Sequence, residues 1–87
     1  MARFDKRVAM VTGAASGIGQ ATAGLLAEDG AVVAALDRVA APTPEGGGAW
    51  TVDITDTDAV DGVLGEIRER LGPVDILVNC AGVSLPA

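Results

Sequence analysis

Thr12-Gly13-Ala14-Ala15-Ser16-Gly17-Ile18-Gly19 is the stretch of this 87-residue chain that decides its fold. An apolar run at residues 8–11 precedes it, and apolar positions at helical spacing follow it. A strand, a glycine turn and a helix in this order predict a phosphate site. The turn exposes backbone N–H groups, and the helix N-terminus adds about half a positive charge. The spacing G-x-x-x-G-x-G differs from the common dinucleotide pattern G-x-G-x-x-G. A merely flexible turn is the alternative, and the flanking strand and helix weigh against it.

The segments on either side of the turn predict a βαβ unit. Residues 6–11 read as a first strand, apolar without alternation, as expected when both faces are covered. A helix follows from residue 18, with Gly30 as its expected C-cap. Residues 31–36 form a second apolar run that ends at Asp37. The crossover between the two strands should be right-handed. The expected buried face of the helix comprises Ile18, Ala21, Thr22, Leu25 and Leu26.

The segment at residues 38–48 interrupts this pattern. It contains Pro42, Pro44 and three consecutive glycines, which exclude a good helix. A doubly wound fold normally has a crossover helix here, so we expect that helix to be missing or reduced to a turn. Residues 49–53 then read as a short third strand.

The remaining residues predict one more helix and one more strand. Thr55, with Asp58 three residues later, resembles a capping box and marks the expected helix start. Gly72-Pro73 ends that helix, and residues 74–80 form the fourth strand. The fold class is therefore α/β, a Rossmann-like doubly wound parallel sheet that is incomplete, with strand order 3-2-1-4. Residues 1–87 are expected to form one partial dinucleotide-binding domain. The stripe expected to be buried comprises Val60, Val63, Leu64, Ile67 and Leu71.

Composition excludes several classes of function. A net charge of −6 argues against a nucleic acid or an anionic membrane as partner. The single cysteine, Cys80, cannot form an internal disulfide, and no cluster of residues suggests a metal site. No apolar run reaches the roughly 18 residues of a membrane span, and the N-terminus lacks a signal-peptide core. A cytoplasmic protein is the resulting expectation.

Asp37 supplies a second element of a dinucleotide site. It ends the second strand 18 residues after Gly19, where a carboxylate can accept hydrogen bonds from the ribose hydroxyls of an adenosine. The same carboxylate repels a 2′-phosphate, which favours NAD over NADP. A solvated strand-end aspartate is the alternative, and Arg38 weakens the discrimination because a guanidinium could meet a 2′-phosphate. A P-loop NTPase is excluded, since no Gly-Lys-Ser/Thr occurs and Lys6 is the only lysine.

Three motifs together resemble the short-chain dehydrogenase/reductase family. They are the glycine turn at residues 12–19, Asp53-Ile54 after the third strand, and Asn79-Cys80-Ala81-Gly82 after the fourth. The family patterns are T-G-x-x-x-G-x-G, Asp followed by a hydrophobic residue, and N-N-A-G. Cys80 replaces the second Asn of the last pattern, and we expect it to pack at the strand end rather than react. Trp50 is likewise expected to be a packing residue.

The resemblance assigns roles to individual residues. It implies that the turn from Gly13 to Gly19, Gly17 included, holds the pyrophosphate of the cofactor, with Ser16 and Ile18 along it. Asp37 takes the adenosine ribose, while Asp53 and Ile54 meet the adenine. Asn79 lies near the second ribose, and Gly82, which closes the last motif, is also assigned to cofactor binding. Thr12 is implied to be a structural tie between the first and fourth strands. Asp53 as a simple turn cap and Asn79 as a simple strand end remain the alternatives.

The family's catalytic Ser and Tyr-x-x-x-Lys have no counterparts in this sequence, which lacks tyrosine altogether. No catalytic residue is therefore assigned. We expect the chain to be the NAD-binding front half of an oxidoreductase that transfers hydride between NAD(H) and a hydroxyl/carbonyl pair. The apolar edge of the fourth strand is expected to be covered by the remainder of the fold, on a missing or separate segment. The resemblance also implies a homo-oligomeric parent. A catalytically silent nucleotide-binding module, or a truncated product, is the alternative.

Overall fold

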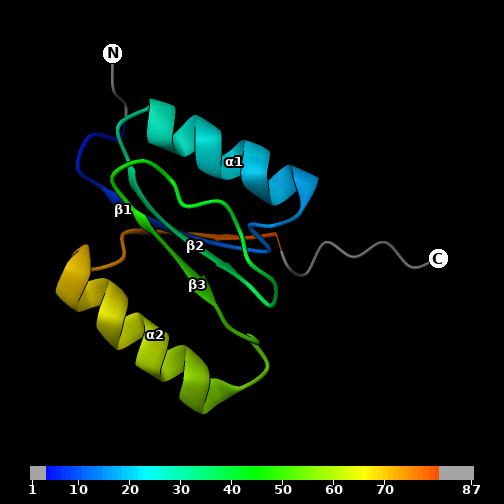
Figure 1. Cartoon of the computed structure of the whole chain (residues 1–87). Coiled ribbons are helices and arrows are strands. Elements are labelled where there is room, and N and C mark those ends of the chain that lie inside the picture. Colours follow the sequence, from blue (N-terminus) through cyan, green and yellow to red (C-terminus); the bar gives the residue numbers. More distant parts are fainter. Residues whose placement is uncertain (1–3, 81–87) are drawn as a thin grey trace.

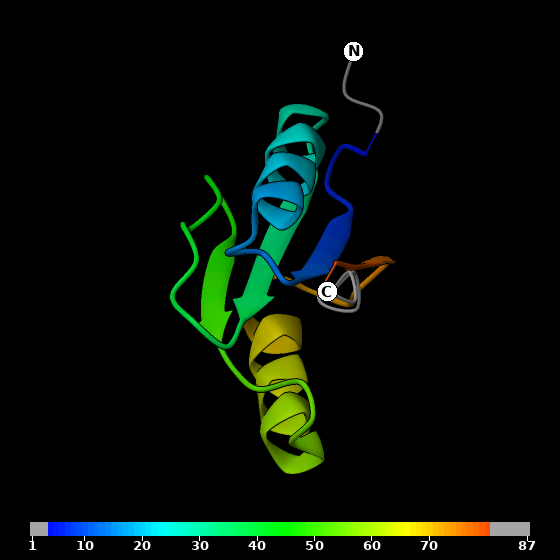
Figure 2. The ribbon, with the colours of Figure 1, turned by 90° about the vertical axis from the view of Figure 1, so that its right-hand side faces the viewer.

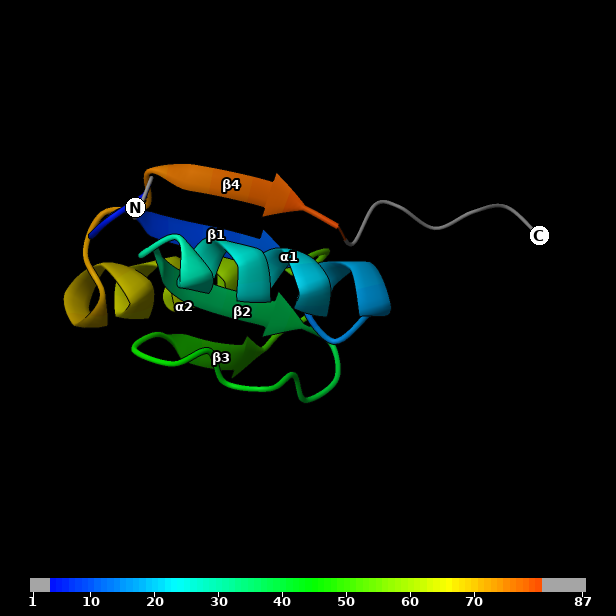
Figure 3. The ribbon, with the colours of Figure 1, turned by 90° about the horizontal axis from the view of Figure 1, so that it is seen from above.

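The computed structural model describes residues 4–80, which form one parallel sheet with a helix on each face (Figure 1). The sheet order is β3-β2-β1-β4, and all three strand pairs are parallel. Figure 3 shows the strands pointing the same way, with β4 at one edge and β3 at the other. The predicted α/β class and strand order are confirmed. In chain order the elements are β1 (Val8–Thr12), α1 (Gly17–Glu28), β2 (Val32–Asp37), β3 (Gly48–Thr51), α2 (Thr57–Arg70) and β4 (Ile76–Asn79).

The sheet lies between the two helices (Figure 2). It separates two apolar clusters, one under each helix. On the α2 side, Met10 and Leu36 of the sheet pack with Val63 and Ile67 of the helix. On the α1 side the cluster consists mostly of alanine and valine, and Ala23 is its helical member. All five residues of β1 are buried because both of its faces are covered. Continuous burial explains why the strand sequence shows no alternation.

The buried face predicted for α1 is wrong. Ile18 and Leu25 are 60% and 64% exposed, and Leu26 is the one large member of the predicted face that packs, in part, toward the sheet. The helix instead buries Gly19 and Ala23. A Cβ on Gly19 would lie only 2.0 Å from the carbonyl oxygen of Gly13, so this end of α1 is seated directly on the backbone of the turn. Because α1 lies so close to the turn and the sheet, only small residues fit on its inner face, and the larger apolar residues lie on its outer face.

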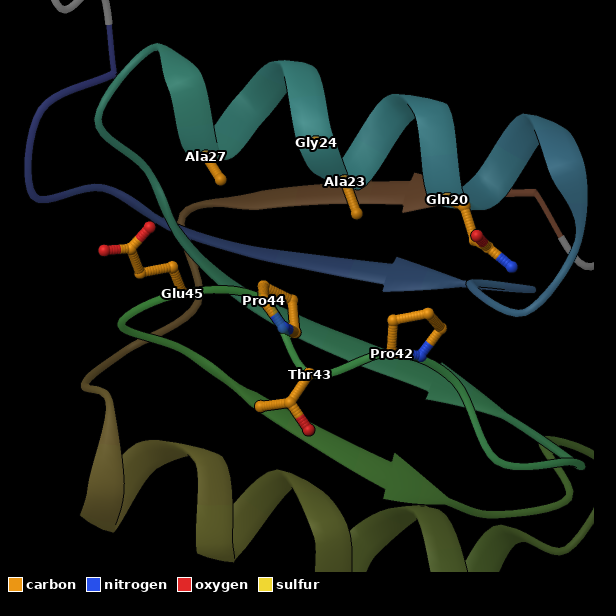
Figure 4. A pocket seen from close by; sticks show the side chains of 8 residues that line it. All are labelled: Gln20, Ala23, Gly24, Ala27, Pro42, Thr43, Pro44 and Glu45. Atoms are coloured by element: carbon orange, nitrogen blue, oxygen red, sulfur yellow. The ribbon is translucent and has the colours of Figure 1, made fainter.

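The connection from β2 to β3 contains no helix within residues 38–47, as the prolines and glycines predicted. A turn closes it, with the N–H of Gly47 donating to the carbonyl of Pro44 at 3.0 Å. Figure 4 shows Pro42 and Pro44 facing α1 across a shallow hollow of about 200 Å³. The extended connection therefore takes the place of the missing crossover helix on this face.

The start predicted for α2 is also wrong. Asp56, not Thr55, is the N-cap, and its side chain accepts from the N–H of Ala59 at 3.1 Å. The predicted stripe is confirmed: Val63 and Ile67 are buried, and the other members pack partly against the same cluster. The helix ends before Gly72, whose φ of 112° suits glycine.

Trp50 of β3 packs partly against the α2-side cluster, as predicted. The Arg70 guanidinium at the end of α2 lies 5.2 Å from the centroid of its ring, a cation–π distance. A Cβ on Gly48 would come within 2.7 Å of the same ring, so the indole covers that glycine. Trp50 thus connects β3 to the last turn of α2.

Candidate functional site

An open cleft of about 690 Å³ lies where the strands β1, β2 and β3 end. Ligands of open α/β sheets bind outside the carboxyl ends of the strands, at the point where the strand order reverses. Here that point lies between β1, which leads to α1, and β4 on the other side. Seven of the ten residues predicted to bind a cofactor line the cleft. Its lining comprises Gly13, Ser16, Gly17, Ile18, Asp37, Arg38, Val52, Asp53, Ile54, Thr55 and Cys80.

Ser16 holds the glycine turn in shape. Its hydroxyl donates to the carbonyl of Gly13 at 2.7 Å and accepts from the N–H of Gly19 at 3.0 Å. The same hydroxyl is the N-cap of α1. Gly13 has a φ of 70°, which favours glycine, and Gly17 faces open space. The three glycines therefore differ in function: Gly13 permits the turn, Gly17 leaves room, and Gly19 allows the helix to approach.

Replacing Ser16 with alanine is expected to lower the free energy of unfolding by about 1 kcal/mol, the usual cost of losing an N-cap. Both hydrogen bonds of the hydroxyl disappear, and the N–H of Gly19 loses its side-chain acceptor. Urea unfolding followed by circular dichroism measures the loss. Ser16→Thr is the control, because its hydroxyl can make the same bonds. Equal stability of the alanine variant and the unaltered protein would contradict this account of the turn.

Asp37 lies at the end of β2 with both carboxylate oxygens engaged. Oδ2 accepts from the N–H of Ala15 at 2.9 Å, and Oδ1 accepts from the N–H of Arg38 at 2.6 Å. Partial burial raises the pKa of this carboxyl, but the backbone N–H donors and the Arg38 charge outweigh it. The pKa therefore lies below its ordinary value. The group is a carboxylate at neutral pH and cannot donate a hydrogen bond.

Asp53 follows β3 and forms a small turn with Thr55. Its Oδ1 accepts from both the backbone N–H and the hydroxyl of Thr55, at 2.9 and 2.7 Å. These two bonds lower the pKa of the Asp53 carboxyl, and the Arg38 charge adds to the effect. Ile54 beside it is 38% exposed and lines the same cleft. A second ionised carboxylate and an apolar side chain thus share this side of the cleft.

The remaining predicted residues lie elsewhere. Gly19 is buried under the turn, and Gly82 is outside the described residues. Asn79 is not part of the cleft lining; its Oδ1 accepts from the Thr12 hydroxyl at 2.8 Å. That bond joins β1 to β4 and confirms the structural tie expected of Thr12. Cys80 packs partly against the α1-side cluster, as expected, and also lines the cleft.

Sequence reasoning missed one polar member of the cleft lining, Thr55, and one effect of another, Arg38. Thr55 was assigned to a helix cap, although a threonine two residues after Asp53 has the spacing of an aspartate turn. The sequence suggests a part for Arg38 in cofactor choice. Its charge also lowers the pKa of both Asp37 and Asp53, which can be recognised only once the fold brings the three residues together. Within residues 4–80, no group of three or more metal-ligating side chains is placed to hold a metal ion. No helix in that range is long and apolar enough to cross a membrane.

The sequence matches the family model for short chain dehydrogenases over residues 7–87. The chain belongs to this family. Short-chain dehydrogenases bind a nicotinamide dinucleotide, which agrees with a cleft at the carboxyl ends of parallel strands. The resemblance that the three motifs indicated is therefore confirmed.

Individual short-chain dehydrogenases are similar over most of this chain. Meso-2,3-butanediol dehydrogenase of Serratia marcescens is 40% identical, over 93% of this chain and 36% of the relative. NAD-dependent glycerol dehydrogenase of Listeria innocua is 46% identical, over 94% of this chain and 37% of the relative. The ligand-free structure of Thermoplasma acidophilum aldohexose dehydrogenase superposes with a TM-score of 0.83 at 30% identity, over 97% of this chain and 32% of that one. The chain thus spans about a third of the length of these relatives.

Proposed function

We propose that the cleft binds the adenosine diphosphate portion of NAD(H). The observation that carries the proposal is the convergence of three strand ends on one cleft: the glycine turn after β1, Asp37 at the end of β2 and Asp53 after β3. The turn offers backbone N–H groups at the start of a helix, which suits the pyrophosphate. The two carboxylates are hydrogen-bond acceptors, which suit the ribose hydroxyls and the adenine amino group.

In this proposal each part of the cleft meets one part of the cofactor. The backbone from Gly13 to Gly19 holds the pyrophosphate. Gly17 leaves space for it, since a Cβ there would meet no atom within 4 Å beyond its own stretch of backbone. Ser16 shapes the turn, and Ile18, 60% exposed, covers one side of the bound phosphates. By resemblance to the family, Asn79 lies toward the second ribose, and Gly82 is a further cofactor-binding residue.

In this proposal the adenosine is bound by Asp37, Asp53 and Ile54. A carboxylate oxygen has two lone-pair sites, and Oδ2 of Asp37 accepts one backbone N–H, from Ala15, so this oxygen can still accept a ribose hydroxyl. Asp53 uses one oxygen for Thr55, which leaves the other to face the adenine amino group. Ile54 supplies an apolar surface for the adenine ring.

The ionised Asp37 favours NAD over NADP, because a 2′-phosphate would lie against a carboxylate. Arg38 moderates this preference, since its charge already acts on both carboxylates. We expect NADH to bind at least about tenfold more tightly than NADPH, as two like charges near a protein surface repel by a few kcal/mol. Energy transfer from Trp50, the only tryptophan, to the reduced nicotinamide provides the titration signal.

The matched variant for this titration is Asp37→Ser, which removes the charge and leaves a small hydrogen-bonding side chain. It should reduce the preference for NADH to within about threefold, because the repulsion of the 2′-phosphate is gone. Tighter binding of NADPH than of NADH by the unaltered protein would contradict the role of Asp37. Binding of neither cofactor would contradict the proposed site itself.

We further propose that the protein is an oxidoreductase, in which the bound nicotinamide exchanges a hydride with a hydroxyl/carbonyl substrate. The residues of this chain would bind and orient the cofactor at one end. Nucleotide binding without turnover is the second candidate, because the side chains of the cleft lining that the proposal uses are all cofactor-binding groups. A panel of secondary alcohols with NAD, monitored for NADH, separates the two. Binding of NADH with no turnover of any alcohol or of the corresponding carbonyls would favour the second.

A further inference from the structure

Asp37 connects the end of β2 to the glycine turn, 22 residues earlier in the chain. The N–H of Ala15 donates to its Oδ2 at 2.9 Å. One residue earlier, the N–H of Ala14 donates to the carbonyl of Leu36 at 3.0 Å. Two consecutive N–H groups of the turn are thus bound to two consecutive residues of β2. The pairing of β1 with β2 therefore continues into the turn through the Asp37 side chain.

The Asp37 side chain is itself held in one orientation. Its Oδ1 accepts from the N–H groups of Arg38 and Val39, at 2.6 and 3.4 Å, while Oδ2 points to Ala15. Bonds at both oxygens fix the rotation of the carboxylate group. A fixed acceptor orders the backbone that donates to it, since charge-assisted hydrogen bonds are short and strong.

The other side-chain contacts of the turn do not replace this one. Ser16 bonds Gly13 and Gly19, which closes the turn on itself but does not attach it to β2. The Gln20 side chain donates to the carbonyl of Ala15 at 3.0 Å from an exposed position on α1. Within residues 4–80, Asp37 is the side chain that joins the turn to β2.

We propose that Asp37 is a positioning residue for the pyrophosphate-binding turn, in addition to any contact with the adenosine ribose. The carboxylate holds the Ala15 backbone in place, so affinity for a phosphate group depends on it even when no ribose is present. The inference rests on the proposed function for the identity of the ligand. The contact between Asp37 and Ala15 is independent of that function and is measured without ligand.

A purely electrostatic role and a positioning role of Asp37 predict opposite changes in anion affinity when its carboxylate is removed. Removing a carboxylate beside an anion site should tighten the binding of an anion, because a repulsion is lost. Removing a positioning group should weaken that binding, because the backbone donors move out of alignment. Asp53 is the matched control: it is a second carboxylate of the same cleft, and it accepts hydrogen bonds from Thr55, not from the turn.

The experiment titrates inorganic pyrophosphate, which has no ribose, into the unaltered protein, Asp37→Ala and Asp53→Ala, followed by amide NMR shifts. Asp37→Ala should weaken pyrophosphate binding about tenfold, comparable to the loss of one strong hydrogen bond. Asp53→Ala should leave it unchanged or make it tighter. Equal or tighter binding by Asp37→Ala would overturn the proposal.

Amide hydrogen exchange in the ligand-free protein supplies the second readout. The Ala15 N–H should exchange slowly in the unaltered protein and in Asp53→Ala, and much faster in Asp37→Ala, while amides of α2 keep their protection. Fast exchange of Ala15 in the unaltered protein would overturn the proposal even if Asp37→Ala failed to fold. Slow exchange of Ala15 together with no binding of NADH or pyrophosphate would instead contradict the proposed function and leave the contact intact.

Discussion

Gly19→Ala is expected to lower the free energy of unfolding by about 3 kcal/mol and to abolish cofactor binding. A Cβ on Gly19 would lie 2.0 Å from the carbonyl oxygen of Gly13, 2.7 Å from its carbon and 2.9 Å from the Cα of Ala14. All three are backbone atoms, so relief requires that α1 or the turn move as a whole. Overpacking against a rigid neighbour costs this much, and the movement would also displace the N–H groups of the turn.

Substitutions at two other glycines of the same helix distinguish effects on stability from effects on cofactor binding. Gly24 and Gly17 both have open space where a Cβ would be. Gly24→Ala should stabilise the protein by about 0.5–1 kcal/mol, because alanine is the better helix former. Gly17→Ala should fold normally yet bind NADH weakly, since its methyl group enters the cleft. Chemical denaturation and NADH titration of the three variants measure both effects. A Gly19→Ala protein as stable as the unaltered one would refute the close seating of α1.

Ile67→Ala is expected to be the most damaging truncation on α2, with a loss of about 2–5 kcal/mol. Ile67 is 0% exposed, and it packs with Met10 and Leu36 in the cluster beneath the helix. Val63 and Ile67 are the two buried residues of this helix, so removing Ile67 leaves a cavity and loosens the attachment of α2. Against a typical total stability of about 5–15 kcal/mol, the loss could unfold the domain.

Leu25→Ala provides the control for that truncation, because it removes a branched apolar side chain of equal size from α1. Leu25 is 64% exposed, so its removal should change the free energy of unfolding by less than about 0.5 kcal/mol. Thermal and urea unfolding of both variants give the comparison. Similar losses in the two would mean that burial does not distinguish these positions and that the α2-side core is misassigned.

The outline of the fold followed from sequence because its signals were local. Two apolar runs, a glycine turn between them and a terminal aspartate identified the βαβ unit, and proline with glycine at residues 38–48 predicted the lost helix. The α1 face could not be predicted from apolar spacing, since close seating on the turn reverses the usual preference and buries Gly19 and Ala23. The contact of α1 with the glycine turn is a tertiary contact, and the spacing of apolar residues along a helix carries no information about it.

The site was predicted in outline for a related reason. Parallel strands have their carboxyl ends at the same edge of the sheet, independently of the conformation of the loops. The sequence therefore predicts that Asp37 and Asp53 lie on the same side of the site. The α2 cap was misassigned because several capping residues stand in a row, and local propensity does not choose between Thr55 and Asp56. The Asp37 bond to Ala15 depends on side-chain rotation and on a turn 22 residues away, and both become visible only in three dimensions.

The helix-free connection between β2 and β3 also marks where the protein can be extended by engineering. Sheet register here is set by the strand pairs themselves, from Ala34 with Gly48 to Asp37 with Thr51. Lengthening a surface loop costs only about 0.6 kcal/mol for each doubling. A peptide tag or reporter inserted at the exposed Thr43 would lie away from the residues that line the cleft. Gly47 must be avoided, because a Cβ there would lie 1.9 Å from the carbonyl oxygen of Val33.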